Sequence, residues 1–396
     1  MTGNKRCLAL HGRKKEPPKR HGAALLRPGI IRTDSEQDRQ VGYMFIPSTN
    51  VRTQFTCKAG PPRVSWRLLF FGTDQFAVES LKLLNLCRNS NEGIVEKLEV
   101  VTLPGDLPVK RFAQQNQLAL HNWPPHIVEG QFDVGVVVSF GRLLHRGLIV
   151  KFPFGILNVH PSLLPRWRGP APVFHTVMHG DTVTGVTVIQ IRPDKFDVGP
   201  ILNQEIHQVP KNCTAEDLGA ALATKGAHLL LDTLMKLPEK IANKREQEPK
   251  GVTFAPKINR SMSWINWEEQ TCDQIACLCR AIGSRIPLRT MWMGETIKLL
   301  DFVGKCYTSD ERNQKPGSVY YDKDSNTLAV CCKDGWVAFR TVLLNKRLTA
   351  ADFHNGYLNQ TVKKNTSSKP AEGQFVSRKG RTEELQTNTW RGQKKQ

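Results

Sequence analysis

The spacing of apolar residues predicts alternating strands and helices in the first half of the chain. Arg67–Phe71 is a short apolar run, and a helical stripe that begins at Phe76 follows it. Further strands are expected at 98–102, 132–139 and 156–160, and further helices at 109–117, 171–179 and 214–237. Strands that alternate with helices predict an α/β domain over residues 66–240, with a Rossmann-like, mostly parallel sheet.

The pattern changes beyond residue 258, where short strands follow one another closely. A helix is expected over 267–282, and Asp334-Gly335 has the composition of a hairpin turn. The expected strands are 288–292, 296–303, 318–321, 327–332 and 336–343. Five strands at this spacing predict a small β-barrel domain over residues 259–358. Its four tryptophans are interpreted as core residues rather than as platforms for stacked bases: Trp264, Trp267, Trp292 and Trp336.

Three segments lack the pattern of a packed domain. Residues 1–60 begin with many Lys and Arg and, as far as Arg32, a single acid, Glu16. This composition is typical of a mitochondrial transit peptide, and a disordered basic arm or a misassigned first exon is the alternative. Residues 241–258 are polar and predict a linker between the domains. Residues 359–396 have the composition of a disordered basic tail.

The charge of the chain points to a polyanionic partner. The formal net charge is +20, from 56 basic and 36 acidic residues, and RNA is the leading candidate. No apolar run approaches the roughly 18 residues of a membrane span. The ten cysteines form no Cys-x-x-Cys pair, which favours reduced structural thiols over a metal site. His175 and His179 are four residues apart, but without a third ligand they are interpreted as surface or capping residues.

The strongest candidate chemistry lies in the predicted strand 156–160. Side chains alternate along a strand, so Asn158 and His160 point to the same face, and Pro161 ends the ladder. Ligands of open α/β sheets bind beyond the carboxyl ends of the strands, which is where this pair lies. An amide can donate to an oxyanion and an imidazole can move a proton near neutral pH, so the pair suits acyl transfer.

A carboxylate from a predicted hairpin can join this pair. The alternating runs 184–191 and 201–209 flank a loop with Asp197 near its tip, two residues before Gly199. Asp197 can orient His160 and favour the charged form of its ring. The alternative is a polar cluster that only satisfies the hydrogen bonds of a loop.

With these motifs the sequence resembles the formyltransferases that use 10-formyltetrahydrofolate. The matching elements are Asn-x-His, then Ser-Leu-Leu-Pro-x-x-Arg-Gly at 162–169, then an Asp-x-Gly tip, and the resemblance covers about residues 66 to 358. Among these enzymes the chain looks most like the methionyl-tRNA formyltransferases of mitochondria. The resemblance implies catalysis by Asn158, His160 and Asp197 and an oligonucleotide-binding-type barrel. It implies folate contacts at Phe140, Gly141, Leu143, Ser162, Leu163, Leu164, Pro165, Arg168, Gly169 and Gly199, although the 140–144 loop can also be a plain turn.

The resemblance also implies two substrates and no metal: 10-formyltetrahydrofolate and initiator methionyl-tRNA, used by a monomer in the mitochondrial matrix. The family's bacterial members grip the tRNA with a long basic loop, whereas Thr102–Val109 is short and acidic. We therefore expect tRNA contacts at Lys110, Arg111, Arg285, Arg289, Lys298, Arg340 and Lys346. Rival interpretations are a formyltransferase for a ribonucleotide or an amino sugar, a formyltetrahydrofolate hydrolase, and a non-catalytic RNA-binding protein that retains the fold.

Overall fold

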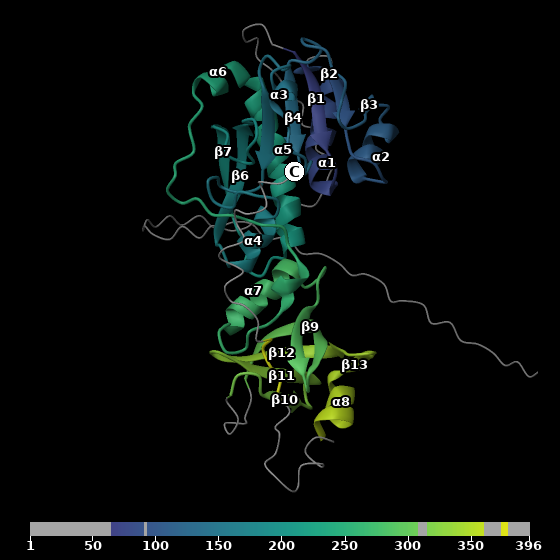
Figure 1. Ribbon diagram of the computed structural model, residues 1–396, viewed down its shortest axis with the longest axis vertical. Helices are drawn as coiled ribbons and strands as arrows, with labels where there is room; N and C mark the ends of the chain where they lie inside the picture. The colour runs from purple at the N-terminus through teal and green to yellow at the C-terminus, as the bar shows by residue number, and fades with distance from the viewer. Residues whose placement is uncertain (1–64, 91–92, 308–314, 360–373, 379–396) are drawn as a thin grey trace, which may run out of the picture. The chain divides into compact units, whose positions relative to one another are not determined.

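The computed structural model describes residues 65–90, 93–307, 315–359 and 374–378, which all belong to one compact unit spanning Gly60–Gln396. The unit contains two β-sheets, drawn in purple to teal for the first and in green to yellow for the second in Figure 1. The predicted transit peptide lies outside the described residues.

The first sheet has seven strands in the order β3-β2-β1-β4-β5-β6-β7. The pairs from β3 to β5 are parallel, and β6 and β7 join antiparallel, so the prediction of a mostly parallel sheet is confirmed. The strands are β1 (Trp66–Gly72), β2 (Val95–Val101), β3 (Leu120–His121), β4 (Val134–Val138), β5 (Ile156–His160), β6 (Val183–Gln190) and β7 (Ile201–Gln208).

Strand β1 shows why its sequence is apolar without interruption. Leu68 and Phe70 pack into the hydrophobic core on one face of the sheet, while Leu69 and Phe71 pack into the core on the other. A strand buried on both faces needs apolar residues at every position, as parallel sheets covered on both sides do.

The helices of this part begin where capping residues predict. Asp74 Oδ1 accepts from the Ala77 amide at 3.2 Å, and Thr214 and Asp217 form a capping box. The predicted helix 214–237 ends at Met235, and a separate helix begins at Leu237, with Pro238, which lacks an N–H, in its first turn. The helices are α1 (Gln75–Arg88), α2 (Pro108–Gln115), α3 (Arg146–Ile149), α4 (Pro172–Met178), α5 (Ala215–Met235) and α6 (Leu237–Ala242). The sequence analysis missed the short elements β3, α3 and α6.

The second sheet is antiparallel, in the order β10-β11-β12-β9-β8, with β13 paired to β12. All five strands expected here are present within three residues of their predicted ends, and the 333–334 turn joins β11 to β12. The elements are η1 (Arg260–Ser263), α7 (Cys272–Ile282), β8 (Leu288–Trp292), β9 (Glu295–Cys306), β10 (Val319–Asp322), β11 (Thr327–Cys332), β12 (Gly335–Leu343), β13 (Arg347–Thr349), α8 (Ala350–Phe353) and η2 (His354–Leu358).

Residues 374–378 correct the prediction of a disordered tail. Val376 exchanges both backbone hydrogen bonds with Met291 of β8, at 2.9 and 3.1 Å, while the Phe375 amide donates to Gly317, just before β10. The segment therefore links the two outer strands of the sheet and closes the barrel, which only long-range pairing could reveal. The Phe375 side chain is fully buried beside Trp292, with ring centroids 5.7 Å apart.

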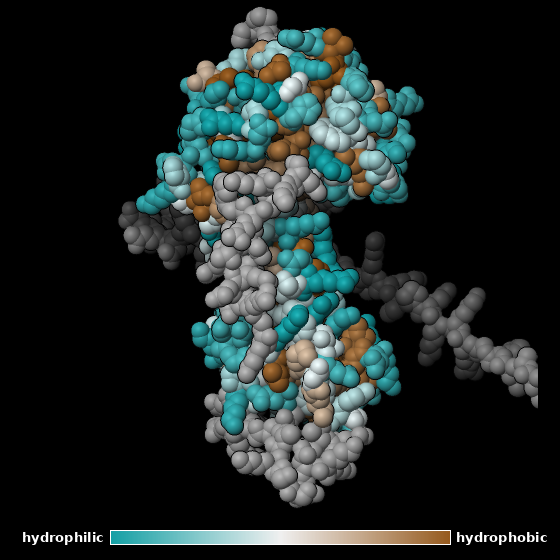
Figure 2. Space-filling model, viewed as in Figure 1, coloured by the Kyte–Doolittle hydropathy of each residue, from teal (hydrophilic) through white to brown (hydrophobic). Residues whose placement is uncertain are grey.

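The tryptophans of the barrel divide into two groups. Trp267 and Trp292 are buried, which confirms their interpretation as core residues. Trp264 and Trp336 are only partly buried. Hydrophilic side chains dominate the face seen in Figure 2, with hydrophobic ones in scattered groups. Within the described ranges, no helix is long and apolar enough to cross a membrane.

Candidate active site

The three predicted catalytic side chains meet at the carboxyl end of β5. Asn158 Nδ2 donates to Asp197 Oδ1 at 3.2 Å, and His160 Nδ1 lies 3.5 Å from the same oxygen. Asn158 and His160 share a face of β5, as strand alternation predicts, and Asp197 comes from the loop between β6 and β7. Strand alternation and the hairpin thus bring together residues 39 positions apart.

The Asp197 carboxylate and the His160 imidazole each make a further contact with the loop after β5. The second oxygen of Asp197, Oδ2, accepts from the Gly169 amide at 2.9 Å. His160 Nε2 lies 2.9 Å from the Trp167 carbonyl. A carbonyl oxygen only accepts, so Nε2 donates there, and Nδ1 is the ring nitrogen that faces Asp197. His160 is 5% exposed, so its ring lies in a confined site.

The loop after β5 is fixed by a buried hydroxyl that the sequence analysis missed. Thr187 Oγ1 of β6 donates to the Ser162 carbonyl at 2.6 Å and accepts from the Leu164 amide at 3.2 Å. It also accepts from Gln204 Nε2 of β7 at 2.8 Å, and that amide reaches the Leu164 carbonyl as well. Two neighbouring strands therefore set the path of residues 162–165.

The next part of the loop is anchored through Trp167. Its ring N–H donates to Asp181 at 2.8 Å, and Arg166 makes two hydrogen bonds to the same carboxylate while lying 4.3 Å from the indole centroid. His175 and His179 pack against the indole at 5.4 and 4.7 Å. His179 is exposed and caps α4, as predicted. His175 is instead buried, because the indole packs on its ring and the Pro256 carbonyl lies 2.9 Å from its Nε2. This burial lowers the pKa of the ring.

A basic cavity of about 590 Å³ lies between α3 and the loop that joins β6 to β7. Three of its lining residues carry positive charge: Arg146 at the start of α3, and Arg192 and Lys195 on the loop that also carries Asp197. Val198, the neighbour of Asp197 in the chain, completes that side. The cavity was not predicted, since α3 and the β6–β7 loop are 40 residues or more apart and share no motif.

Comparisons with known proteins show the family to which the chain belongs. Residues 82–234 match the formyl transferase family and residues 257–358 match its C-terminal domain. The human mitochondrial methionyl-tRNA formyltransferase is 50% identical over 387 residues, covering 94% of this chain and 95% of its own length. The bovine one is 53% identical over 321 residues, covering 78% and 82%. The chain belongs to the methionyl-tRNA formyltransferase family.

A solved structure of a formyltransferase has a similar fold. An N-formyltransferase from Helicobacter canadensis, in complex with folinic acid and dTDP-3-aminofucose, aligns with a TM-score of 0.52 at 18% identity. The alignment covers 69% of this chain and 98% of that one. At this identity the likeness concerns the fold alone.

The predicted folate residues take two kinds of position. Ser162, Leu164, Phe140 and Gly199 are buried among protein atoms, where they shape the loops. The Ser162 hydroxyl, for example, donates to the Arg166 carbonyl at 2.6 Å. The remaining members are exposed or partly exposed and leave atoms free to contact a ligand: Gly141, Leu143, Leu163, Pro165, Arg168 and Gly169.

Two of the predicted tRNA residues, Arg111 and Arg285, already have protein partners. Arg111 pairs with Asp106 at 2.8 Å, beside Lys110 in α2. Arg285, just after α7, pairs with Glu216 of α5 at 3.0 Å and lies 4.8 Å from the Phe174 ring of α4. Arg285 therefore joins the two sheet-bearing parts of the unit, a role that its sequence position did not indicate.

Two other predicted tRNA residues lie side by side on the barrel. Arg289 of β8 is directly opposite Lys298 of β9. Among the described residues, Arg289 Nε is buried with no hydrogen-bond partner. On the same face of these strands lies a hollow of about 540 Å³, whose lining includes Trp264 and Arg378. Arg340 and Lys346 are exposed on β12 and on the turn before β13.

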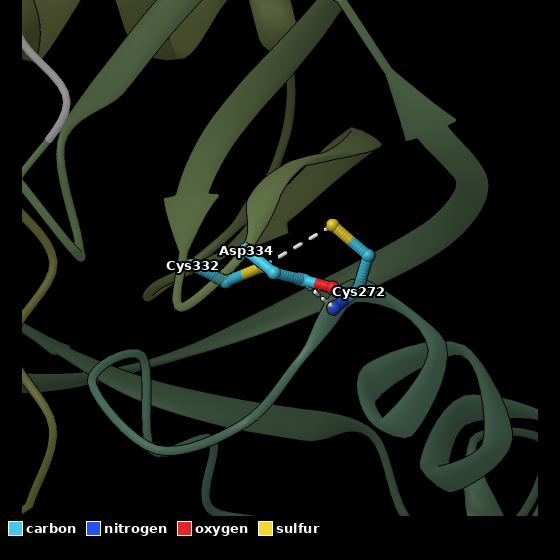
Figure 3. A group of neighbouring side chains, drawn as sticks. All are labelled: Cys272, Cys332 and Asp334. Atoms are coloured by element: carbon cyan, nitrogen blue, oxygen red, sulfur yellow. Dashed lines mark hydrogen bonds between the residues drawn. The ribbon is translucent and has the colours of Figure 1, made fainter.

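One group of potential metal ligands occurs in the described part of the chain: Cys272, Cys332 and Asp334 (Figure 3). The two sulfur atoms are 3.3 Å apart, and Asp334 Oδ1 accepts from the Cys272 amide at 2.7 Å. Burial raises the pKa of both thiols, which favours their neutral forms. The pair packs the start of α7 against the β11–β12 hairpin, and Asp334 adds an acceptor for the first amide of that helix, whose N-cap is Thr271. The group shares no element with the catalytic residues.

Proposed function

We propose that this protein transfers the formyl group of 10-formyltetrahydrofolate to the α-amino group of methionine on initiator methionyl-tRNA in mitochondria. The observation that carries this function is the meeting of Asn158, His160 and Asp197 at the end of β5. That end of the strand is where open α/β sheets bind their ligands. The full-length likeness to the human mitochondrial enzyme supports the acceptor and the compartment.

In the reaction the neutral amine attacks the formyl carbon, and the carbonyl oxygen becomes an oxyanion. Asn158 has two amide hydrogens, and only one is used by Asp197, so the other is available to the oxyanion. His160 takes a proton from the attacking nitrogen through Nδ1 and returns it to the folate nitrogen that leaves. A carbon–nitrogen bond forms to methionine and one breaks to the folate, with no net change in protons.

Asp197 supports both partners at once. Its Oδ1 faces Asn158 and His160, so it orients the amide and stabilises the imidazolium that forms during proton transfer. Because all three residues belong to one chain, we propose that the monomer is the active form. A measured mass twice that of the chain at working concentration is the contrary result.

The folate substrate is placed by the loops around this cluster. We propose that the exposed backbone of 141–143 and the partly exposed positions of 163–169 contact it, beside the cavity lined by Arg146, Arg192 and Lys195. Folates carry a carboxylate-bearing tail. Arg192 is paired with Glu246 at 2.6 Å, so among the described residues Arg146 and Lys195 supply the unpaired positive charge that attracts such a group. Charge-removing changes at these three positions test this placement by raising the Kd for folate without altering kcat at saturation.

The tRNA is held by the barrel. Like charges directly opposite each other destabilise a sheet, so the Arg289–Lys298 pair favours an anionic partner. We propose that these two residues, with Arg340 and Lys346, contact phosphates. Replacing one of them should lower the salt slope of tRNA binding by roughly one unit. A slope equal to that of the unaltered protein would remove that residue from the interface.

The decisive experiment is formyl transfer with purified protein. Formylation of charged initiator tRNA, with much slower reaction on charged elongator methionyl-tRNA, is the expected result. An unchanged initiator signal in protein carrying His160→Ala would exclude the proposed mechanism. Absence of formylated product with the unaltered, folded protein would exclude the function itself.

A further inference from the structure

The side chain of Gln247 lies between the two loops that hold the catalytic cluster. Its Oε1 accepts from Arg168 Nε at 3.0 Å and from Arg168 Nη2 at 2.6 Å. Its Nε2 donates to the carbonyls of Asp197 and Gly199, at 2.8 Å each. One side chain thus connects the loop after β5 to the loop between β6 and β7. Gln247 follows α6, in the stretch that the sequence predicts to be a linker.

The chemistry of this position requires an amide of this length. The guanidinium of Arg168 can only donate, and the two backbone carbonyls can only accept. A side chain placed between them must therefore accept on one side and donate on the other. Glutamate would place a second acceptor against two carbonyls, and asparagine is one methylene too short to span the same contacts. The amide orientation is fixed by the same partners.

Gln247 holds Asp197 in a conformation that needs support. Asp197 has a φ of 54°, in the left-handed region that residues other than glycine rarely adopt. Such backbone persists where the surrounding contacts over-determine it. Gln247 fixes the Asp197 carbonyl, while the Gly169 amide fixes its carboxylate. Asp197 is therefore held both through its backbone carbonyl and through its carboxylate.

Neighbouring residues keep the Gln247 segment in register with both loops. Arg245 exchanges two backbone hydrogen bonds with Ile201, at 2.7 and 2.9 Å. Thr253 accepts from the Trp167 amide through its hydroxyl at 2.9 Å. The Ala255 amide donates to the Arg168 carbonyl at 2.8 Å. Residues 245–255 are thus fastened to the active site along their length.

We infer that Gln247 is a positioning residue for formyl transfer, acting through the backbone of Asp197. The inference rests on the proposed function. It extends the active site into a segment whose polar composition suggests only a connection between domains, and it adds a residue that touches neither the substrate nor the reacting atoms.

The first test compares Gln247→Met with Glu248→Gln. Methionine keeps the length of the side chain and removes its polar hydrogen-bonding atoms. Glu248 is exposed and has no hydrogen-bond or ion-pair partner among the described residues, so its change is the control. Misplacing a catalytic group by a fraction of an ångström to an ångström typically costs about 10- to 100-fold in rate. We expect kcat to fall by that factor in Gln247→Met, with the KM for methionyl-tRNA within about twofold and Glu248→Gln unaffected.

A double-mutant cycle separates positioning from general destabilisation. If Gln247 acts through Asp197, its replacement should cost less than about threefold in protein that already carries Asp197→Asn, because the effects of coupled residues do not add. The same loss in both backgrounds would overturn the inference, as would a kcat of Gln247→Met within about twofold of the unaltered protein.

A second variant guards against misfolding. Gln247→Glu keeps the contact to Arg168 and opposes the two carbonyls, so it too should lower kcat while the thermal midpoint stays close to that of the control. Normal turnover in Gln247→Glu would also refute the inference. Formyl transfer by the unaltered protein is measured first, so failure of the proposed function appears there, before any variant is compared.

Discussion

A pair of buried threonines allows a sharp test of how the active-site loop is held. Thr187→Val keeps the shape of the side chain and removes a hydroxyl with three hydrogen bonds. Gln204 retains its contact with the Leu164 carbonyl, but the Leu164 amide and the Ser162 carbonyl lose a buried partner. Each buried group left unsatisfied costs about 1–3 kcal/mol, so the loss of partners for two groups should lower the free energy of unfolding by about 2–6 kcal/mol.

Thr176→Val is the matched control. Thr176 in α4 is equally buried, but within the described residues its hydroxyl has no hydrogen-bond partner. The same substitution there removes an unsatisfied polar group and should be neutral or slightly stabilising. Urea unfolding of both variants, with the slope m compared to confirm a common transition, measures the difference. Equal stability of the two variants would show that the hydroxyl contacts at Thr187 do not hold the loop.

Further expectations concern catalysis, acid stability and the barrel. His160→Ala should lower kcat by about 10²–10⁴-fold. Asn158→Ala should lower kcat by about 10²–10³-fold with little change in the Kd for folate. Single-turnover assays measure both effects, and a folate affinity that falls by the same factor as kcat would make Asn158 a binding residue. Arg67 holds the pKa of Asp133 below its usual value, so this pair stabilises the fold fully above about pH 4, and the stabilisation is lost as pH falls through the lowered pKa of the folded state. Asp133→Asn should remove that part of the dependence of stability on pH. An unchanged pH profile of the unfolding free energy would contradict this prediction. Phe375→Ala should destabilise the barrel by about 3–5 kcal/mol, measured by thermal unfolding, and a change below about 1 kcal/mol would mean that the ring is dispensable.

The sequence predicts those features that depend on local pattern. Strand alternation places Asn158 beside His160, and the hairpin signal places Asp197 within reach, so the catalytic cluster follows from three short motifs. The capping box at Thr214 and the Asp334-Gly335 turn likewise mark element ends, because each is formed by residues close in the chain.

The features that escaped prediction depend on long-range partners. The periodicity of apolar residues predicts which face of a helix or strand is buried, but it does not predict which residues pack against that face. Gln247 therefore resembled a spacer residue, although its partners lie 48 to 79 positions away. Phe375 resembled part of a disordered tail, because a five-residue segment that forms only isolated bridges carries too little sequence pattern to be recognised. Arg285 resembled a free cation until Glu216 and Phe174 were found beside it.

The closure of the barrel by residues 374–376 also sets an order of events during biosynthesis. Strands β8 to β12 precede this segment in the chain. Until it is made, Met291 of β8 and Gly317 before β10 present unpaired backbone groups, whereas Arg289 of β8 already pairs with residues 264–265. Such edges are templates for pairing with other chains. A chain that stops at residue 373 keeps every catalytic residue and yet exposes both edges for its whole lifetime. Early termination there should therefore reveal itself first as aggregation and degradation, before any defect in chemistry.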